Sequence, residues 1–263
     1  MRLAVLIPVF NAGLNLQRTL ASLAPDPFPF DIVVVDDGTW QPVELPDAIG
    51  AHSVVLLRHD RNRGIAHALN TGMEYIVARG YEYLARLDAG DINEPRRLAT
   101  QAAHLDRYQR VALVGAWTRH VDEQLRPLFT TRYPATWDTI RRRLHYRTAF
   151  SHPACMIRTR VLPIAGDYNE SFILGEDYEL FWRLAQRFPC ENIPEVLVTR
   201  LESRDSLIYR KRGAAARTRL RLQWQHFAWG RLDCWLGLAR SLTLLALPAR
   251  VVFTLKKAVG TIG

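Results

Sequence analysis

The stretch DIVVVDDG, residues 31–38, decides the fold class of this chain. Residues 32–35 are all β-branched, and such side chains favour strands because they pack well on a pleated surface. The run holds no polar side chain, which is typical of a strand covered on both faces in an α/β protein. Asp36, Asp37 and a glycine follow at once. The pattern predicts a central strand that ends in a polar turn.

The rest of the first half alternates apolar runs with amphipathic stretches. This alternation predicts an α/β fold with a mostly parallel, Rossmann-like sheet and helices on both of its faces. The expected strands are 3–9, 32–35, 53–57, 81–87, 111–117 and 154–157, and the expected helices are 14–23, 65–79, 95–109, 136–145 and 177–187. From about residue 206 the composition changes to a basic, helical segment.

Polar side chains fall just past the ends of the expected strands. Asn11 follows the first strand, Asp36 and Asp37 follow the second, and Asp88 follows the fourth. Ligands bind at the carboxyl ends of the strands in open α/β sheets. Burying two adjacent acids is costly unless they are paired, although an Asp-Gly turn is a common alternative. We therefore expect a ligand site or a turn at Asp36 and Asp37.

The stretch RNRGIAHALNTG, residues 61–72, opens a helix through Gly64. The free N–H groups of that helix start, together with Arg61 and Arg63, would suit the diphosphate of a nucleotide. The stretch has neither the Walker A pattern nor a GxGxxG pattern, which disfavours an ATPase and a dinucleotide-dependent dehydrogenase. An ordinary helix start is the alternative.

The stretch RLDAGDINEPRRL, residues 86–98, places Asp88 and Asp91 three residues apart. Two such oxygen ligands suit Mg²⁺ or Mn²⁺, which keeps waters and takes other ligands from substrate phosphates. Asp91 has an alternative, structural role in the loop that leads to Pro95, where we expect the first position of a helix. The eight histidines form no ligand cluster, and the three widely spaced cysteines are expected to be buried thiols.

The stretch GEDYELFWRL, residues 175–184, places Glu176 and Asp177 at a helix start. Asp177 shares a helical face with Phe181 and Leu184, so we expect it to point toward the sheet. An inward carboxylate beside other acidic sites is a candidate general base. The helix dipole alone accounts for Glu176. His152 is expected either to line a cleft or to be a hydrogen-bonded loop residue.

The chain is basic, with a net charge of +9 from 35 Lys and Arg against 26 Asp and Glu. Residues 209–224 are arginine-rich and contain no acid, which favours an anionic partner. No later apolar run reaches the roughly 20 residues that a membrane-spanning helix needs. We expect a helix in the membrane interface, with packing on the domain as the alternative. Nucleic-acid binding is disfavoured because the aromatic residues fall beyond the basic run.

Six segments taken in order resemble the family 2 glycosyltransferases with the A-type fold. They are LIPVFN, VVVDDG, NRGIAHALNTG, RLDAGDINEPRRL, SHPACMIR and GEDYELFWRL. The resemblance covers residues 1–205 and implies an inverting transferase that moves a sugar from a nucleoside-diphosphate sugar to a hydroxyl of a glycan. It also implies that the acceptor is lipid-linked, that the enzyme takes part in surface polysaccharide biosynthesis, and that it acts at the inner-membrane surface. We expect a cytoplasmic protein, peripheral on the cytoplasmic face of the membrane.

The resemblance also divides the chain by role. Residues 1–92 would form the nucleotide-binding half, 93–205 the acceptor half, and 206–263 a basic amphipathic segment. Asp37 would hydrogen-bond the base, with Asp36 beside it. The residues expected around the nucleotide are Pro8, Phe10, Asn11, Asp36, Asp37, Asn62, Arg63, Gly64 and Asp88.

The matched acids would carry the chemistry. Asp88 and Asp91 would hold the divalent metal, Mg²⁺ or Mn²⁺. Asp177 would deprotonate the acceptor hydroxyl, and Glu176 would position the acceptor. Arg200 and Ser206 would approach the diphosphate.

The chain departs from the family pattern at Gly90. Family members usually carry a metal-ligating acid at this third position of D-x-D-D. Either Asp91 reaches the metal from one position further on, or the site binds metal weakly and arginines share the diphosphate charge. A non-catalytic protein that binds nucleotide sugars is the alternative that Gly90 raises.

Overall fold

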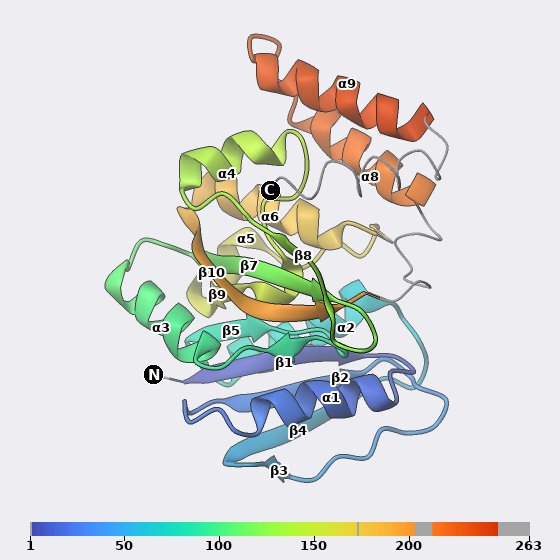
Figure 1. The fold of residues 1–263 in the computed structure, drawn as a ribbon, viewed down its shortest axis with the longest axis vertical. Helices are drawn as coiled ribbons and strands as arrows, with labels where there is room; N and C mark the ends of the chain where they lie inside the picture. Colours follow the sequence, from blue (N-terminus) through green and yellow to red (C-terminus); the bar gives the residue numbers. More distant parts are fainter. Residues whose placement is uncertain (1, 173, 203–211, 247–263) are drawn as a thin grey trace.

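The computed structural model describes residues 2–172, 174–202 and 212–246 (Figure 1). The strands are β1 (Leu3–Val9), β2 (Asp31–Asp36), β3 (Ala48–Ile49), β4 (His52–Arg58), β5 (Tyr83–Arg86), β6 (Ile92–Asn93), β7 (Leu113–Val121), β8 (Pro127–Thr131), β9 (Met156–Arg158) and β10 (Cys190–Leu201). They form a ten-stranded sheet in the order β3-β4-β2-β1-β5-β9-β7-β10-β6, and β8 pairs with β7 off this path. One sheet therefore runs through both expected halves of the catalytic region.

The sheet is mostly parallel, as the sequence predicts. The pairs β1–β2, β1–β5, β2–β4 and β7–β10 are parallel. The short strand β9 lies between β5 and β7 and is antiparallel to both, so β7 keeps the direction of β5. Strands β4, β2, β1, β5, β7 and β10 consequently all run in one direction, and their carboxyl ends meet at one rim of the sheet.

Helices cover both faces of the sheet (Figure 1). Their bounds are α1 (Leu14–Leu23), α2 (Ile65–Ala78), α3 (Arg97–Arg107), α4 (Trp137–Leu144), α5 (Leu162–Ala165), α6 (Glu176–Arg187), α8 (Arg212–Gln225) and α9 (Leu232–Ala246), with single 3₁₀ turns η1 (His152–Ala154) and η2 (Thr159–Val161). Helices α1 and α3 pack on one face, and α2, α4 and α6 pack on the other. This confirms the predicted α/β architecture.

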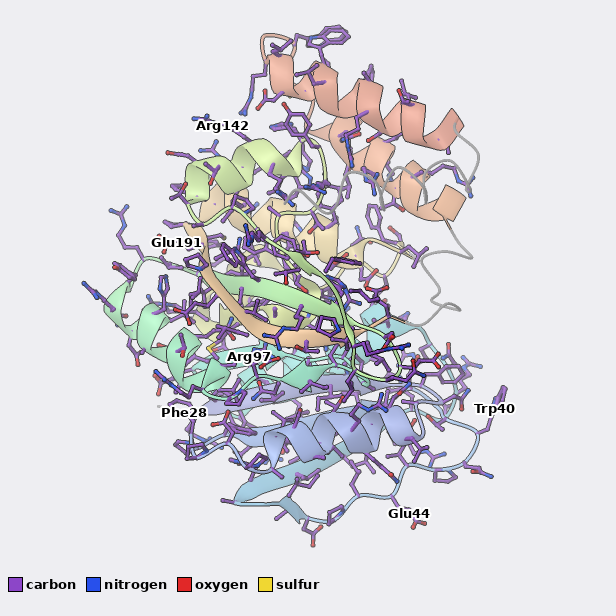
Figure 2. The ribbon with its side chains drawn as sticks, in the orientation of Figure 1. Phe28, Trp40, Glu44, Arg97, Arg142 and Glu191 are labelled. Atoms are coloured by element: carbon purple, nitrogen blue, oxygen red, sulfur yellow. The ribbon has the colours of Figure 1, made fainter. Side chains whose placement is uncertain are left out.

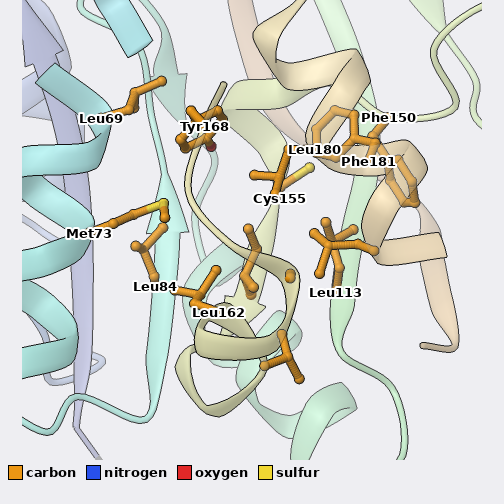
Figure 3. Close-up of a cluster of buried hydrophobic side chains, with 14 of the residues drawn as sticks. Leu69, Met73, Leu84, Leu113, Phe150, Cys155, Leu162, Tyr168, Leu180 and Phe181 are labelled. Atoms are coloured by element: carbon orange, nitrogen blue, oxygen red, sulfur yellow. The ribbon is translucent and has the colours of Figure 1, made fainter. Parts of the chain in front are cut away.

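Two apolar clusters, one on each face, explain why β1 and residues 32–35 of β2 are apolar. Val5 and Ile7 of β1 belong to the cluster under α1 and α3, whereas Ala4 and Leu6 belong to the cluster under α2 and α6. This is the alternation that a strand imposes on successive side chains. In Figure 3, side chains of α2, β5, β7 and α6 meet in the second cluster. Cys155, Cys190 and Cys234 are free and buried, as predicted.

The prediction that Pro95 occupies the first position of a helix is wrong. Helix α3 begins at Arg97, and Arg96 before it has a left-handed φ of 66°. This conformation breaks the helical path between Pro95 and the first turn, so the helix starts two residues late. The loop that carries Asp88 and Asp91 is longer by the same two residues.

The basic C-terminal segment is helical where the structure describes it. Helices α8 and α9 pair as a hairpin beyond α4 and α6 (Figure 1). No helix in the described parts of the chain combines the length and the apolar composition needed to cross a bilayer.

Candidate active site

The loops after β1, β2 and β4 lie against one another at the rim. The amide of Asp37 donates to the carbonyl of Val9 at 2.8 Å, which joins the ends of β1 and β2. Gly38 has a φ of 73°, and a Cβ at this position would collide with the backbone of Arg61. Only glycine permits this close approach, so it brings the loop at 59–64 beside the end of β2.

Asp37 is buried and holds the loop that enters α2. Its Oδ1 accepts from the amide of Arg63 at 3.0 Å, and its Oδ2 accepts from the amide of Gly64 at 2.8 Å. The ring Nδ1 of His59 lies 2.7 Å from Oδ1. These partners explain how a carboxylate is tolerated so close to the core. His59 is a member of this site that the sequence analysis did not single out.

Asp36 has a fully buried side chain and closes the turn. Its Oδ1 accepts from the amide of Thr39, three residues further on, at 2.9 Å, and its Oδ2 lies 3.6 Å from the Nε of Arg58. The turn alternative therefore applies to Asp36, whose carboxylate faces the protein. The hydrogen bonds of Asp36 and Asp37 thus hold the turn after β2 and the loop before α2 in place.

Phe10, Asn11 and Trp40 form the exposed edge of the rim. Asn11 has a φ of 51°, its amide donates to Oγ1 of Thr39 at 3.1 Å, and its Oδ1 accepts from the amide of Trp40 at 3.3 Å. The rings of Phe10 and Trp40 meet edge to face at 6.4 Å, and Trp40 is 86% exposed. Trp40 projects from the molecule at this edge (Figure 2). Pro8 is part-buried in β1 just beneath.

The loop before α2 presents its polar groups to solvent. Asn62 and Arg63 are exposed, and Gly64 precedes the first turn of α2. The guanidinium of Arg63 lies 3.4 Å from His67 on the next turn. Helix α2 has no side-chain cap, and Asp37 occupies two amides before it. The structure thus brings this loop to the same rim as Asn11 and Asp37.

Thr19 of α1 holds the loop that carries the two aspartates. Its buried hydroxyl lies 2.8 Å from the carbonyl of Asp91 and 3.2 Å from that of Asp88, and it accepts from the amide of Gly90 at 2.8 Å. Gly90 has a φ of 109°, which side-chain-bearing residues rarely adopt. An acid at position 90 would therefore be strained in this loop.

Arg86 is a fully buried cation beneath the site. Its Nη1 donates to the carbonyls of Leu6 and Leu87 at 2.9 and 2.8 Å, and its Nη2 donates to Oδ1 of Asp88 at 2.5 Å. Burial acts to raise the pKa of Asp88, but the charges of Arg86 and Arg200 and the hydrogen bond from Arg86 together outweigh burial and hold the pKa below its ordinary value. Asp88 is therefore an ionised carboxylate held in one orientation.

His152 extends this network away from Asp88. Its Nε2 lies 3.3 Å from the Nε of Arg86 and 2.7 Å from the hydroxyl of Tyr168. Burial, together with the charge of Arg86, holds the pKa of His152 well below its ordinary range, so the ring is neutral and Nε2 accepts from both partners. Of the two alternatives for His152, the structure shows the hydrogen-bonded, buried residue.

Asp91 points to Arg200 at the end of β10. The Nε of Arg200 lies 3.6 Å from Oδ2 of Asp91, an atom that is buried and accepts no hydrogen bond. Burial raises the pKa of Asp91 to about 7, although the charge of Arg200 acts against this rise. In the described ranges, no three His, Cys, Asp or Glu side chains cluster so that they could hold a metal ion. Asp88, which is 30% exposed, remains open to the rim.

Glu176 and Asp177 form the first turn of α6. Glu176 is buried, and burial together with the charge of Asp177 raises its pKa to about 8. Burial likewise raises the pKa of Asp177, the amide of Tyr178 acts against this, and the charge of Asp88 adds to it. The pKa values of both carboxyls are therefore higher than those of ordinary acids.

A family model described as Glycosyl transferase family 2 matches residues 4–162. The chain belongs to glycosyltransferase family 2. The matched region begins in β1 and ends at the start of α5, so it contains the whole rim except α6 and β10. The enzyme class follows from the family: this protein is a glycosyltransferase.

Named relatives and solved structures agree with this assignment. The amylovoran biosynthesis glycosyltransferase AmsE of Erwinia amylovora is 28% identical over 80% of this chain and 79% of its own length. The pre-mycofactocin glycosyltransferase of Mycobacterium tuberculosis is 31% identical over 69% of this chain and 38% of its own length.

Two solved structures share the fold. TarS 1-349 of S. aureus in complex with UDP-GlcNAc has a TM-score of 0.64 at 15% identity, over 94% of this chain and 71% of the other. The mannosyltransferase PcManGT of Pyrobaculum calidifontis, in complex with GDP-Man and Mn²⁺, has a TM-score of 0.61 at 15% identity, over 98% and 79%. These likenesses confirm the A-type glycosyltransferase fold of this family 2 enzyme.

Three buried positions of this glycosyltransferase site were not predicted from the sequence. Thr19 lies in the amphipathic pattern of α1, Arg86 looks like an ordinary strand residue, and His59 precedes the recognised loop. A charged or hydroxyl side chain at a position that the strand or helix pattern assigns to the core was the available signal for Thr19 and Arg86. Ser206, the remaining predicted neighbour of the diphosphate, lies outside the described residues.

Replacing Thr19 by valine should loosen the loop at 88–91. The variant leaves the amide of Gly90 and the carbonyl of Asp91 without their buried partner, so the free energy of unfolding is expected to fall by about 1–3 kcal/mol. Chemical denaturation of the purified enzyme measures this loss. Thr19→Ser keeps the hydroxyl and serves as the control. Equal stability of the valine and wild-type proteins would contradict the role of these bonds.

Proposed function

We propose that this glycosyltransferase moves a sugar, with inversion, from a nucleoside-diphosphate sugar to a hydroxyl of a lipid-linked glycan in surface polysaccharide biosynthesis. The relatives named for amylovoran synthesis and for O-antigen biosynthesis support the choice of polysaccharide. The observation that carries the reaction type is the position of Asp177. It lies in the first turn of α6, and the charge of Asp88, two residues past the end of β5, contributes to the rise in its pKa.

The proposed step is a direct displacement at the anomeric carbon. Asp177 takes the proton from the acceptor hydroxyl as its oxygen forms the new glycosidic bond, and the bond to the diphosphate breaks on the opposite face. One displacement inverts the anomeric configuration without a covalent enzyme intermediate. Glu176, buried beside Asp177, would position the acceptor and raises the affinity of the pair for a proton.

The nucleotide would lie along the rim built from the loops after β1, β2 and β4. Phe10 and Trp40 offer exposed rings against which a base can stack, and Asn11 is joined to the backbone of Trp40 by its side-chain hydrogen bond. Asp37 holds the backbone of Arg63 and Gly64, so that loop can face the diphosphate with its exposed polar groups. In this assignment Asp37 acts mainly by holding the loop before α2 in place. Its carboxylate would accept one further hydrogen bond, from the base.

The proposed divalent metal, Mg²⁺ or Mn²⁺, would be held by Asp88. An ionised, partly exposed carboxylate fits an ion that takes its other ligands from phosphates and water. A metal bound there would neutralise charge on the departing diphosphate. We assign Asp91 instead to holding Arg200, because its carboxylate is buried and faces that guanidinium. Arg200 would then add a fixed positive charge on the diphosphate side.

A donor screen tests the proposed function. The full chain is mixed in turn with UDP-, GDP- and dTDP-sugars, with Mg²⁺, Mn²⁺ or EDTA, and its melting temperature is measured. One nucleoside diphosphate and its sugar should raise the melting temperature, since a ligand that binds only the folded state stabilises it. Transfer to a lipid extract, with the product anomer read by NMR, completes the test. Binding without transfer would favour the non-catalytic alternative, and no binding would refute the proposal.

The rate of transfer should rise with pH across neutrality. Asp177 acts only when deprotonated, and burial raises its pKa. The pKa of the adjacent Glu176 is about 8, so protons leave this pair of carboxyls as the pH rises through neutrality. The value of kcat/KM is therefore expected to rise from pH 6 to pH 8.5, whereas an ordinary carboxylate would give a flat profile there. Initial rates across this range check the prediction. A profile already flat above pH 5.5 would contradict it.

We propose that residues 1–92 serve the nucleotide, that 93–205 serve the acceptor, and that 206–263 serve association with the membrane. The lipid-linked acceptor would place the enzyme on the cytoplasmic face of the inner membrane. The nucleotide residues lie on β1, on β2 and in the loops after β1, β2, β4 and β5, and Asp177 and Glu176 lie on α6, which supports the division into two roles.

A further inference from the structure

Four aromatic side chains gather at the turn between α8 and α9, which we call the aromatic turn: Trp224, Phe227, Trp229 and Trp235. The ring of Phe227 lies 5.8 Å from Trp224, 5.3 Å from Trp229 and 4.9 Å from Trp235, centroid to centroid. The three tryptophans are nevertheless 62%, 70% and 45% exposed, in sequence order. Large exposed aromatic clusters are rare on soluble proteins and mark interaction surfaces.

Helix α9 extends this apolar surface along its outer side. Leu232, Leu236 and Leu242 are between 50% and 73% exposed. Helix α9 is the outermost layer of the molecule, on the side of α8 away from the sheet (Figure 1). The exposed leucines and the aromatic turn therefore share an outward-facing region on the same hairpin.

The inner side of the same hairpin is packed on the catalytic domain. Cys234 is buried with its sulfur 3.2 Å from Nδ1 of His145, and the carbonyl of His145 accepts from Gln223 at 2.6 Å. The ring of His226 stacks on Trp182 of α6 at 4.3 Å. The packed alternative for the C-terminal segment therefore applies to the inner face of the hairpin, and this packing fixes the direction of the exposed face.

The charge of the hairpin indicates what covers the exposed face. Residues 212–246 contain six arginines and a single acid, Asp233, which pairs with Arg231 at 2.5 Å. Arg217, Arg221 and Arg240 are exposed. Tryptophans with arginines around an apolar face are the composition of helices that lie in a bilayer interface, and the excess of cations matches anionic headgroups.

We propose that the aromatic turn and the outer face of α9 dock on an anionic lipid bilayer, with α9 lying in the interface. The role of this docking, to bring the enzyme to its acceptor, rests on the proposed lipid-linked acceptor. The binding of the bilayer itself does not depend on the donor sugar. Helix α8 connects the docked face to the active site, because Thr218 packs against Gly175, directly before Glu176. The α8–α9 hairpin thereby joins the docked face to the start of α6.

Vesicle binding of the full chain tests the proposal. The protein is sedimented with vesicles of phosphatidylcholine mixed with phosphatidylglycerol, and with vesicles of phosphatidylcholine alone. We expect at least tenfold stronger partitioning to the anionic vesicles, weakened as salt rises from about 0.05 to about 0.5 M. The triple variant Trp224→Ser/Trp229→Ser/Trp235→Ser should lose at least tenfold in partitioning. Substitution is preferred to removal of α9, which would uncover the packed face around His145.

A matched control replaces three exposed apolar residues elsewhere. Tyr108, Leu128 and Ile164 are 44%, 51% and 58% exposed, and the triple serine variant should bind vesicles as the wild type does. Arg217→Gln/Arg221→Gln/Arg240→Gln supplies a second arm, which should remove the preference for anionic lipid and its salt dependence. Melting temperatures show that each variant is folded.

Three results would overturn the proposal. These are equal partitioning of the tryptophan variant and the wild type, no binding of the wild type to anionic vesicles, and a wild-type dimer that the tryptophan substitutions dissociate. The last would assign the surface to a second copy of the chain. Donor binding, measured by melting temperature without lipid, reports on the glycosyltransferase proposal separately, so failure of docking and failure of that proposal are distinguishable.

Discussion

Replacing Asp177 by asparagine is expected to lower the kcat of sugar transfer by about a thousandfold, while the Kd of the donor stays within about twofold of the wild-type value. Asparagine keeps the size of the side chain and its place at the start of α6, but it does not take a proton at neutral pH. The loss therefore falls on the chemical step and spares binding. Product formation under saturating donor gives kcat, and titration calorimetry gives Kd.

Asp138 provides a control at the same position of another helix. It is the second residue of α4, as Asp177 is the second residue of α6, and it is exposed. Asp138→Asn changes the same charge near a helix N-terminus and should leave kcat unchanged. If Asp177→Asn turned over at a rate close to that of Asp138→Asn, Asp177 would not be the general base.

Replacing Arg86 by methionine is expected to lower the free energy of unfolding by about 3–5 kcal/mol. Methionine fills much of the space of the side chain but supplies none of its hydrogen bonds. The carbonyls of Leu6 and Leu87 lose their donors, and the carboxylate of Asp88 loses its buried cation. Urea denaturation followed by circular dichroism measures the change, and the pKa of Asp88 should rise in the variant.

An exposed arginine supplies the comparison for this loss. Arg126 pairs with Asp122 at 2.8 Å, and its side chain is 73% exposed. Arg126→Met should change the free energy of unfolding by less than about 1 kcal/mol, because solvent screens a surface ion pair. Similar losses for Arg86→Met and Arg126→Met would show that the network beneath Asp88 contributes little to stability.

Elements with an unbroken apolar run or a clean helical spacing were predicted well. The strand expected at 3–9 is β1, Leu3–Val9, and the helix expected at 14–23 is α1, Leu14–Leu23. The long strand β10 was not assigned from its pattern. It contains Pro194 and two register shifts against β7, and these break the alternation on which the prediction depends.

For the candidate site, the sequence likewise predicted some residues and missed others. Asp88 and Asp177 were expected because each acid follows or begins a recognisable element, and such positions reach the rim whatever the details of packing. The partners of these acids were not expected. Thr19 and Asp91 are 72 residues apart along the chain, and no local pattern connects them.

The amino-acid sequence by itself determined the α/β class, the residues at the rim and the basic, aromatic character of the C-terminal segment. These depend on local periodicity and composition, which reflect the face that each element buries. Tertiary structure decided the pairing of Arg86 with Asp88, the turn of Asp91 toward Arg200, and which face of α9 is packed. Those choices depend on contacts between distant segments, where burial makes an unpaired charge too costly and leaves one arrangement favoured.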